Sequence, residues 1–208
     1  GDALTRAAAH ADRCADIAPD WPKAVQRREE VAAAVRAHEG GAAGEGAGGA
    51  GGDDLSAALA VLLDSAASPS SVTAALSRLR QLTHGAAAHK EEACRRGAVD
   101  AVLGCMRAHD SADCHAQGCR ALRSLFFRNE VARAAAGDAA LAQCATVLRN
   151  HAERAVVAAA CISLLVVLLH GNDDGIAAAQ KLGMSELVAR SISATAAAAE
   201  TKAGDESR

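Results

Sequence analysis

The chain has 208 residues and a formal net charge of −3, and half of its residues are apolar although only two are Phe, one is Trp and none is Tyr. Strands favour β-branched and aromatic side chains whereas Ala and Leu are strong helix formers, so this composition excludes most β folds and predicts an all-α protein. The slightly acidic balance, without a run of Lys or Arg, excludes nucleic acid as the expected partner.

The seven cysteines are an odd number and lack the spacing of a small disulfide-bonded domain. They are typical of reduced thiols in a reducing compartment, which predicts a cytoplasmic protein. The most apolar run, residues 155–169, is fifteen residues long, whereas a helix needs about 20 residues to span a bilayer. We therefore interpret this run as a buried helix and expect no membrane partner.

Residues 1–39 predict a helical hairpin whose helices, 3–18 and 22–38, are separated at Pro19-Asp20. A proline at the first helical position with an acidic residue just ahead is a common helix start. The wording ADRCADIAPDWPKAVQRR, residues 11–28, resembles the junction between two tetratricopeptide repeats. This likeness covers about one repeat.

The tetratricopeptide resemblance implies a carboxylate clamp. In members that bind heat-shock proteins, a Lys and an Arg one helical turn apart hold the C-terminal carboxylate of the partner, and Lys23 with Arg27 matches that spacing. Two cations on one helical face suit a carboxylate. The alternative is a solvated surface, because the rest of such a clamp would come from helices ahead of Gly1.

Residues 40–52, GGAAGEGAGGAGG, contain eight Gly and four Ala and predict a flexible linker. Gly44, Gly46 and Gly49 fit the G-x-G-x-x-G pattern of dinucleotide-binding proteins. No strand precedes them and no βαβ unit surrounds them, so we expect no dinucleotide and no other cofactor.

Residues 53–195 predict a series of helices, and residues 196–208 are expected to be a disordered tail. Asp54 is a candidate cap for the first helix, and Pro69 or Ser70 is expected to open the second. The expected helices are 55–63, 71–83, 89–96, 99–108, 113–127, 130–136, 139–148, 152–169, 176–182 and 185–193.

A glycine and a closing leucine recur at a constant separation along this series. The glycine precedes the leucine by 28 residues in each of three copies, which are Gly51 with Leu79, Gly97 with Leu125 and Gly137 with Leu165. A fourth glycine, Gly183, opens a copy without a closing third helix. Successive glycines are 46, 40 and 46 residues apart, and internal periods of about 40–47 residues are typical of helical solenoids.

The block from His89 to Leu125 resembles an armadillo repeat. Its Gly97-Ala98-Val99 is similar to the family's Gly-Ala-Ile corner, and its Ala121-Leu122-x-x-Leu125 is similar to the family's Ala-Leu-x-Asn-Leu third helix. The resemblance covers about residues 51–193 and implies a right-handed α-α superhelix. HEAT-like packing is the close alternative.

The third helices of an armadillo stack line a concave groove, so the resemblance nominates groove residues. Peptide-binding members carry a Trp and, four residues on, an Asn in each third helix, and this chain has neither at the corresponding positions. Those positions are Ala74 and Arg78, Arg120 and Ser124, and Ala160 and Leu164. With Arg123, the arginines would form a basic groove with an apolar end at Leu164, which suits an acidic and partly apolar protein segment. The alternative is that the arginines are merely solvated.

The polar residues include one candidate metal site and no recognised catalytic motif. Zinc ligation by His109, Cys114, His115 and Cys119 is suggested by proximity, since two of them are four residues apart. The register instead favours a small core side chain at Cys119, so we expect no metal. There is no G-x-S-x-G, Walker or H-E-x-x-H motif in the sequence, and we expect no enzymatic activity.

The sequence therefore predicts a non-enzymatic scaffold that binds a protein or peptide segment along an armadillo groove. The alternative is a co-chaperone or assembly factor, similar to tetratricopeptide–armadillo factors of myosin or dynein assembly, that recruits a heat-shock chaperone and holds a client. The order of the two resemblances along the chain supports this alternative. We also expect a fragment of a longer array, because terminal repeats need polar caps.

Overall fold

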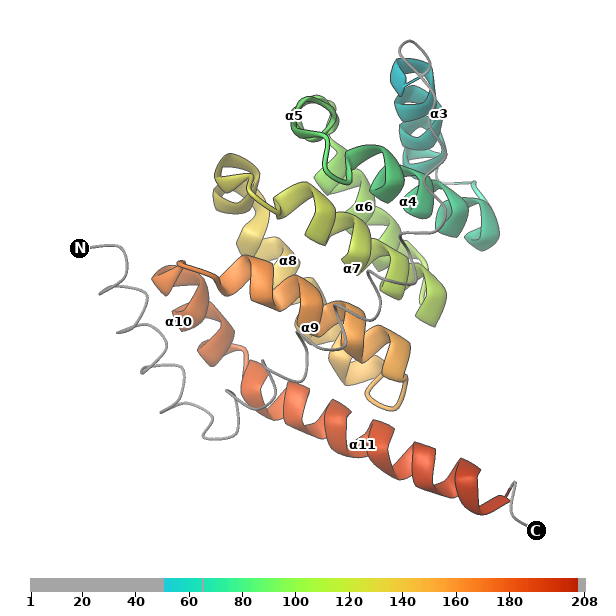
Figure 1. Cartoon of the computed structure of the whole chain (residues 1–208), viewed down its shortest axis with the longest axis vertical. Helices are drawn as coiled ribbons and strands as arrows, with labels where there is room; N and C mark the ends of the chain where they lie inside the picture. Colours follow the sequence, from blue (N-terminus) through green and yellow to red (C-terminus); the bar gives the residue numbers. More distant parts are fainter. Residues whose placement is uncertain (1–50, 65, 206–208) are drawn as a thin grey trace. The chain divides into compact units, whose positions relative to one another are not determined.

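The computed structural model describes residues 51–64 and 66–205, and every regular element within them is an α-helix (Figure 1). By its contacts the chain divides into two units, Gly1–Ala47 and Gly48–Arg208, and all described residues belong to the second. The predicted hairpin, its clamp pair Lys23 and Arg27, and most of the Gly-rich segment lie outside the described residues. The all-α expectation is confirmed for the part that the structure describes.

The helices follow one another with short connections, and most begin within about one helical turn of the predicted positions. Their bounds are α3 (Gly51–Leu63), α4 (Pro69–Thr83), α5 (Ala87–Arg95), α6 (Ala98–Ala108), α7 (Ala112–Phe126), α8 (Glu130–Asn150), α9 (Ala155–Leu169), α10 (Asp173–Lys181) and α11 (Met184–Asp205). Helix α11 continues through most of the tail that was expected to be disordered. Residues 196–199 are all Ala, the strongest helix former.

Side-chain caps explain where several helices begin. In each case an oxygen of a Ser or Asn side chain accepts a hydrogen bond from a backbone N–H three residues on, which satisfies one of the free amides of the first turn. The caps and their donors are Ser68 and Ser71, Ser111 and Cys114, Asn129 and Ala132, and Asn172 and Gly175. Pro69, predicted to open a helix, is the first residue of α4.

The starts of the helices recur at intervals of 43 residues. Helices α4, α7 and α9 are each fifteen residues long, and they begin at Pro69, Ala112 and Ala155. Helices α5, α8 and α10 begin at Ala87, Glu130 and Asp173. We call two residues equivalent when they are 43 positions apart. The repeat spacing of 46, 40 and 46 residues that was predicted from the glycines is therefore wrong, and the helices repeat every 43 residues.

The predicted corner at Gly137 is wrong, because Gly137 lies inside the continuous helix α8. Corners with a left-handed residue occur at Gly97 (φ 77°) and Gly183 (φ 66°). The position halfway between them is Ala140, which is buried within α8. An alanine favours the helical conformation and is strained in the left-handed region, so the chain continues as a helix where the neighbouring segments turn.

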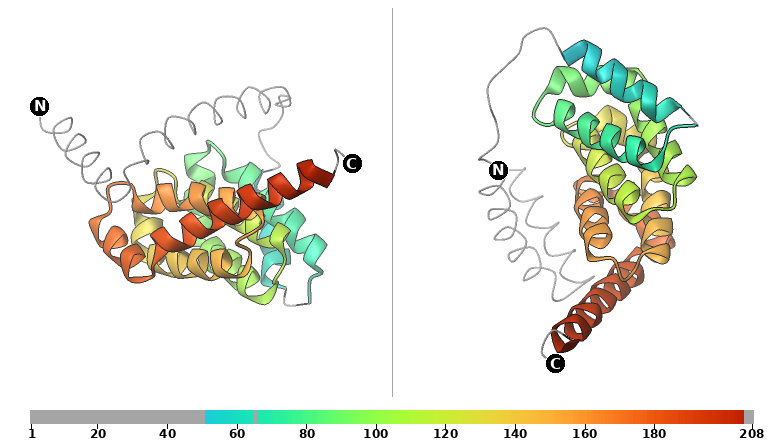
Figure 2. Two further views of the ribbon diagram at one scale, coloured as in Figure 1. Left: turned by 90° about the horizontal axis from the view of Figure 1, so that it is seen from below. Right: turned by 90° about the vertical axis from the view of Figure 1, so that its right-hand side faces the viewer.

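The helices pack in two rows. Helix α7 lies between α4 and α9, while α6 lies between α3 and α8, and each of α4, α7 and α9 also packs on the helix of the other row that precedes it (Figures 1 and 2). The core between the rows consists of leucines, small residues and one phenylalanine, including Leu76, Leu122, Phe126, Leu148 and Leu168. Helix α7 therefore has helices on both sides in its own row.

The most apolar helix, α9, is part of this core, as expected from its sequence. Val157, Cys161, Leu164 and Leu168 are its fully buried side chains. Among the described residues no helix combines the length and the apolar character that a membrane crossing requires. The apolar run at residues 155–169 is thus accounted for by packing against α7 and α8.

Candidate functional site

Three of the seven nominated groove residues lie in the protein core. Ser124, Ala160 and Leu164 are buried, and the Ser124 hydroxyl accepts a hydrogen bond of 2.9 Å from the hydroxyl of Thr83 on α4. These three side chains join α4, α7 and α9 to one another. The nomination of Ser124, Ala160 and Leu164 as partner-contacting residues is therefore corrected, because a partner cannot reach them in this structure.

Arg78 and Ala74, the nominated residues of α4, are both exposed. The guanidinium of Arg78 forms an ion pair with the carboxylate of Asp54 on α3. Asp54 lies inside α3, which begins at Gly51, so the prediction that it caps this helix is wrong. Arg78 thus faces the row of α3, and reversing its charge would disturb an intramolecular contact.

The 40-residue spacing used to match α7 with α9 explains why Ala160 and Leu164 are misplaced. Leu125 was matched with Leu165, 40 residues on, whereas the helices match Leu122 with Leu165. Sliding a helix by three residues rotates the selected position by about 60° around the axis. Such a shift is enough to move a position from the exposed face into the core.

The 43-residue spacing defines a consistent surface, which we call the α4–α7–α9 face. Arg120 is equivalent to Ser77 and Ser163, and Arg123 is equivalent to Arg80 and Val166. All of these side chains are partly or fully exposed. The face therefore consists of Ser77, Arg80, Arg120, Arg123, Ser163 and Val166. Sequence analysis missed Arg80, Ser77, Ser163 and Val166 because it used the wrong spacing.

The charge on the α4–α7–α9 face changes from one end to the other. Arginines lie on α4 and α7, whereas α9 carries no charged residue between Ala155 and Leu169. Val156 and Ile162 add exposed or partly exposed apolar area on α9. Asp113, at the start of α7, is also exposed. The result is a basic region beside an apolar one.

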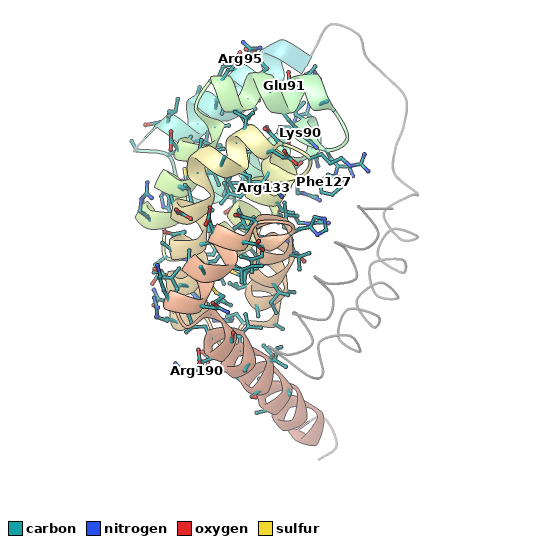
Figure 3. All side chains as sticks on the ribbon, turned by 90° about the vertical axis from the view of Figure 1, so that its left-hand side faces the viewer. Lys90, Glu91, Arg95, Phe127, Arg133 and Arg190 are labelled. Carbon is teal, nitrogen blue, oxygen red and sulfur yellow. The ribbon has the colours of Figure 1, made fainter. Side chains whose placement is uncertain are left out.

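Two cations at equivalent positions hold the far ends of α7 and α9. The ammonium of Lys90 donates a hydrogen bond of 3.0 Å to the carbonyl of Phe127, and the guanidinium of Arg133 donates at 3.2 Å to the carbonyls of Val167 and His170. Positive charge is favourable at a helix C-terminus. Figure 3 shows Lys90, Phe127 and Arg133 on one side of the molecule. Their contacts are structural.

Phe127 and Arg128 follow the C-terminal end of α7 and lie close to Lys90. The ring of Phe127 is 46% exposed, and the cationic groups of Lys90 and Arg128 each lie 5.3 Å from its centre. Burial, together with the charge of Arg128, lowers the pKa of Lys90. Two cations thus contact one aromatic ring at the C-terminal end of α7.

The four residues that suggested zinc in the sequence do not come together. His115 turns toward Asp110, whereas the Cys119 sulfur lies 3.5 Å from the Cys161 sulfur. Cys144 of α8 joins these two thiols, and the three sulfur atoms lie within 4.8 Å of one another. Hydrogen bonds with the other two thiols, together with burial, raise the pKa of Cys119. At Cys144 the hydrogen bond with Cys119 lowers the pKa, but the hydrogen bond with Cys161 and burial outweigh it and the pKa is raised.

A second polar cluster, which sequence analysis did not identify, lies where two turns meet. Asp110 is in the turn between α6 and α7, His115 is on α7 and His151 follows α8. Nε2 of His115 is 3.3 Å and Nε2 of His151 is 3.0 Å from the same oxygen of Asp110. Burial lowers the pKa of His115. The hydrogen bonds from His115 and His151 lower the pKa of Asp110.

Beside this cluster is a crevice of about 200 Å3, lined by Met106, Asp110, His115 and Gln143 among others. In comparisons with models of protein families, with curated proteins and with solved structures, nothing matches this chain. A function is therefore proposed from the described residues alone. They offer two candidates: the α4–α7–α9 face, and the cluster of Asp110, His115 and His151.

Proposed function

We propose that the chain is an armadillo-like interaction module that binds an acidic and partly apolar protein segment across the α4–α7–α9 face. The observation that carries this proposal is the constant spacing of 43 residues between three helices of equal length, which gives equivalent exposed positions on adjacent helices. In helical solenoids the partner is bound by side chains of this kind of continuous surface. The right-handed superhelix and the armadillo family are part of the proposal.

The chemistry of the face supports an acidic partner. Arg80 on α4 and Arg120 and Arg123 on α7 are neighbours in the same row of helices. Guanidinium groups bind carboxylates through paired hydrogen bonds in a fixed geometry, so they are better suited to Asp and Glu side chains than lysines would be. An extended segment is expected to place its acidic residues over α4 and α7.

The apolar part of the face supports a mixed sequence in that segment. Val156, Ile162 and Val166 on α9 continue the surface beyond the arginines. Burying apolar area contributes about 25 cal/mol per Å2, and it does not depend on ionic strength as the arginine contacts do. A segment that runs from acidic to apolar therefore fits the face in one direction only.

Fluorescence anisotropy with labelled short peptides tests this proposal directly. The probe pool carries Asp and Glu in one half and Leu and Val in the other, and the reference pool has Lys in place of the acids. We expect saturable binding of the acidic pool alone. Reversing two charges, with Arg120→Glu and Arg123→Glu, is expected to weaken binding by about tenfold or more, which corresponds to about 1.4 kcal/mol.

Arg190→Glu is the control, because Arg190 is an exposed arginine on α11, a helix that contributes no residue to the face. It changes the net charge by half as much as the double reversal, so a general electrostatic effect would appear in it as well, at a smaller size. Circular dichroism checks that each variant is folded. The proposal is wrong if the reversal at Arg120 and Arg123 leaves binding unchanged, or if Arg190→Glu weakens it equally.

A further inference from the structure

Three potential metal ligands converge on one point at the edge of the protein. The Nε2 atoms of His115 and His151 approach the same Asp110 oxygen, at 3.3 Å and 3.0 Å, and their ring centres are 4.8 Å apart. The three ligand atoms all lie within 4.8 Å of one another. Imidazole nitrogens and a carboxylate oxygen are ligands typical of zinc and related transition metals.

We propose that Asp110, His115 and His151 bind one divalent transition-metal ion such as Zn2+. Zinc lies about 2.0–2.2 Å from nitrogen and carboxylate ligands, so neighbouring ligand atoms in a tetrahedral site are about 3.3 Å apart. Both distances from the Asp110 oxygen are close to this value. A small rotation of the exposed Asp110 side chain is sufficient to admit the ion between the three atoms.

Without a metal, both imidazoles donate an Nε2 proton to a single carboxylate oxygen. Binding of the ion at Nε2 requires the other neutral tautomer of each imidazole, so the Nε2 proton is lost to solvent and Nδ1 takes up a proton, which leaves Nε2 as a neutral ligand. His115 is only 3% exposed, so its ring is held in place by its surroundings. One ligand of the site is therefore preorganised by the core.

Access and a remaining coordination position are both present. The Asp110 side chain is 74% exposed, so an ion can approach from solvent. The crevice of about 200 Å3 beside the ligands has room for a water molecule as the fourth ligand. Three protein ligands and one open position are the arrangement of zinc sites that bind a further molecule.

The buried thiols are a less suitable site for the same ion. Cys119, Cys144 and Cys161 are fully buried, so an ion would have to cross the core to reach them. Thiols must also lose their protons to bind zinc. The raised pKa of Cys119 and of Cys144 opposes that loss, although hydrogen bonds from these two thiols lower the pKa of Cys161 to about 5. The cluster at Asp110 has one exposed, one partly exposed and one buried ligand, and solvent reaches it through Asp110.

Metal binding would connect two successive parts of the fold. Asp110 lies in the turn before α7, and His151 lies in the turn before α9. A bound ion would hold these turns together at one end of the two helices. Any ligand that binds only the folded state raises its stability, so the melting temperature is expected to rise with zinc concentration. This proposal does not depend on the proposed interaction function.

The test uses the full chain after treatment with a chelator. Isothermal titration with Zn2+ alone is expected to show one equivalent bound, and Co2+ is expected to give the visible absorption of a tetrahedral site with nitrogen and oxygen ligands. The melting temperature should rise by several degrees with saturating Zn2+. Asp110→Asn and His151→Gln are each expected to weaken binding by about 100-fold or more.

Two control variants make the outcome specific. His84→Gln removes an exposed histidine far from the cluster in sequence and should leave binding unchanged, whereas Cys144→Ala tests the thiols. His115 is not used, because it is buried and its replacement can unfold the chain. The proposal is overturned if one equivalent of Zn2+ does not bind, if Asp110→Asn and His151→Gln bind as tightly as wild type, or if only Cys144→Ala abolishes binding.

Discussion

Two equivalent stretches of the chain, residues 87–126 and 130–169, differ in whether the segment before their last helix contains a corner. Before α7, the first stretch contains α5, a corner at Gly97, and α6. Before α9, the second stretch contains the single helix α8, in which Ala140 is the residue equivalent to Gly97. Nevertheless α7 and α9 begin at equivalent positions and have the same length. The row formed by α4, α7 and α9 is therefore maintained whether or not the preceding segment turns.

The connections that follow α4, α7 and α9 also keep the same positions although their residues differ. After α4, α7 and α9 the chain passes through a left-handed residue, which is Gly85, Arg128 and Gly171 respectively. These three residues are equivalent, although one of them is an arginine. Packing between neighbouring helices of the α4–α7–α9 row therefore sets the 43-residue spacing. The connecting residues adapt to this spacing at some cost in stability.

The largest effect is expected at Gly118, which is specific to the stretch 87–126. A Cβ placed at Gly118 would lie 2.6 Å from two atoms of the Met106 side chain on α6, whereas the equivalent residue of α9 is Cys161. We expect Gly118→Ala to lower the free energy of unfolding by about 1–3 kcal/mol through overpacking, measured by urea denaturation.

Gly104→Ala provides the matched control for that change. Gly104 also lies in a helix, but nothing is within 4 Å of a Cβ at this position. The substitution is therefore expected to stabilise the protein by about 0.5–1 kcal/mol, because alanine is the better helix former. If Gly104→Ala and Gly118→Ala have the same effect, close packing between α6 and α7 is not what requires a glycine at 118.

A second prediction concerns the corner itself. Gly97→Ala introduces a side chain at a φ of 77°, with no atom within 4 Å of the new Cβ, so the cost is one of backbone strain and is expected to be about 1–2 kcal/mol. Ala140→Gly in α8 is expected to cost about 1 kcal/mol from helix propensity. Urea denaturation measures both changes.

The outcome at Gly97 decides how different the two stretches are. A neutral or stabilising Gly97→Ala would mean that α5 and α6 can join into one helix, as the corresponding residues of α8 do. An increase of helix content in circular dichroism would accompany that change. Ala140→Gly, in turn, should leave the helix content nearly unchanged if packing rather than the residue at 140 keeps α8 continuous.

Most of the helices could be predicted from the sequence, whereas their register could not. Leucines recur every three or four residues on these apolar helices, so Leu125 can be matched with Leu165 as easily as with Leu168. The three-residue error rotates the selected face by about 60°. Gly137 supported the wrong register because it precedes Leu165 by the same 28 residues that separate Gly97 from Leu125. The capping residues Asn129 and Asn172, which are 43 residues apart, carried the correct spacing.

The candidate sites were predictable only in part for the same reason. Arg120 and Arg123 were found because they lie in the best-defined helix, α7. Arg80 was not, since its position depends on the register of α4. The cluster at Asp110 was out of reach, because His151 is 41 residues away in sequence and only the packing of one turn against another brings it to the carboxylate.

The smallest effect on stability is expected at Arg128. It also distinguishes the turn after α7 from the equivalent turn after α9. Among the described residues it is the one non-glycine with a positive φ, 57°, and its charge lies near that of Lys90, whose pKa it helps to lower. Arg128→Gly removes both the backbone strain and the repulsion, but a glycine also gains entropy in the unfolded chain. The net gain in stability is expected to be about 0.5–1 kcal/mol.

The reciprocal change, Gly171→Arg, places the same side chain in the equivalent turn after α9 and is expected to lower the free energy of unfolding by about 1 kcal/mol. Urea denaturation of both variants compares the turns directly. A loss of stability in Arg128→Gly would show that the contact of Arg128 with the Phe127 ring, at 5.3 Å, outweighs the strain. In that case the arginine stabilises its turn, and the two turns are held by different interactions.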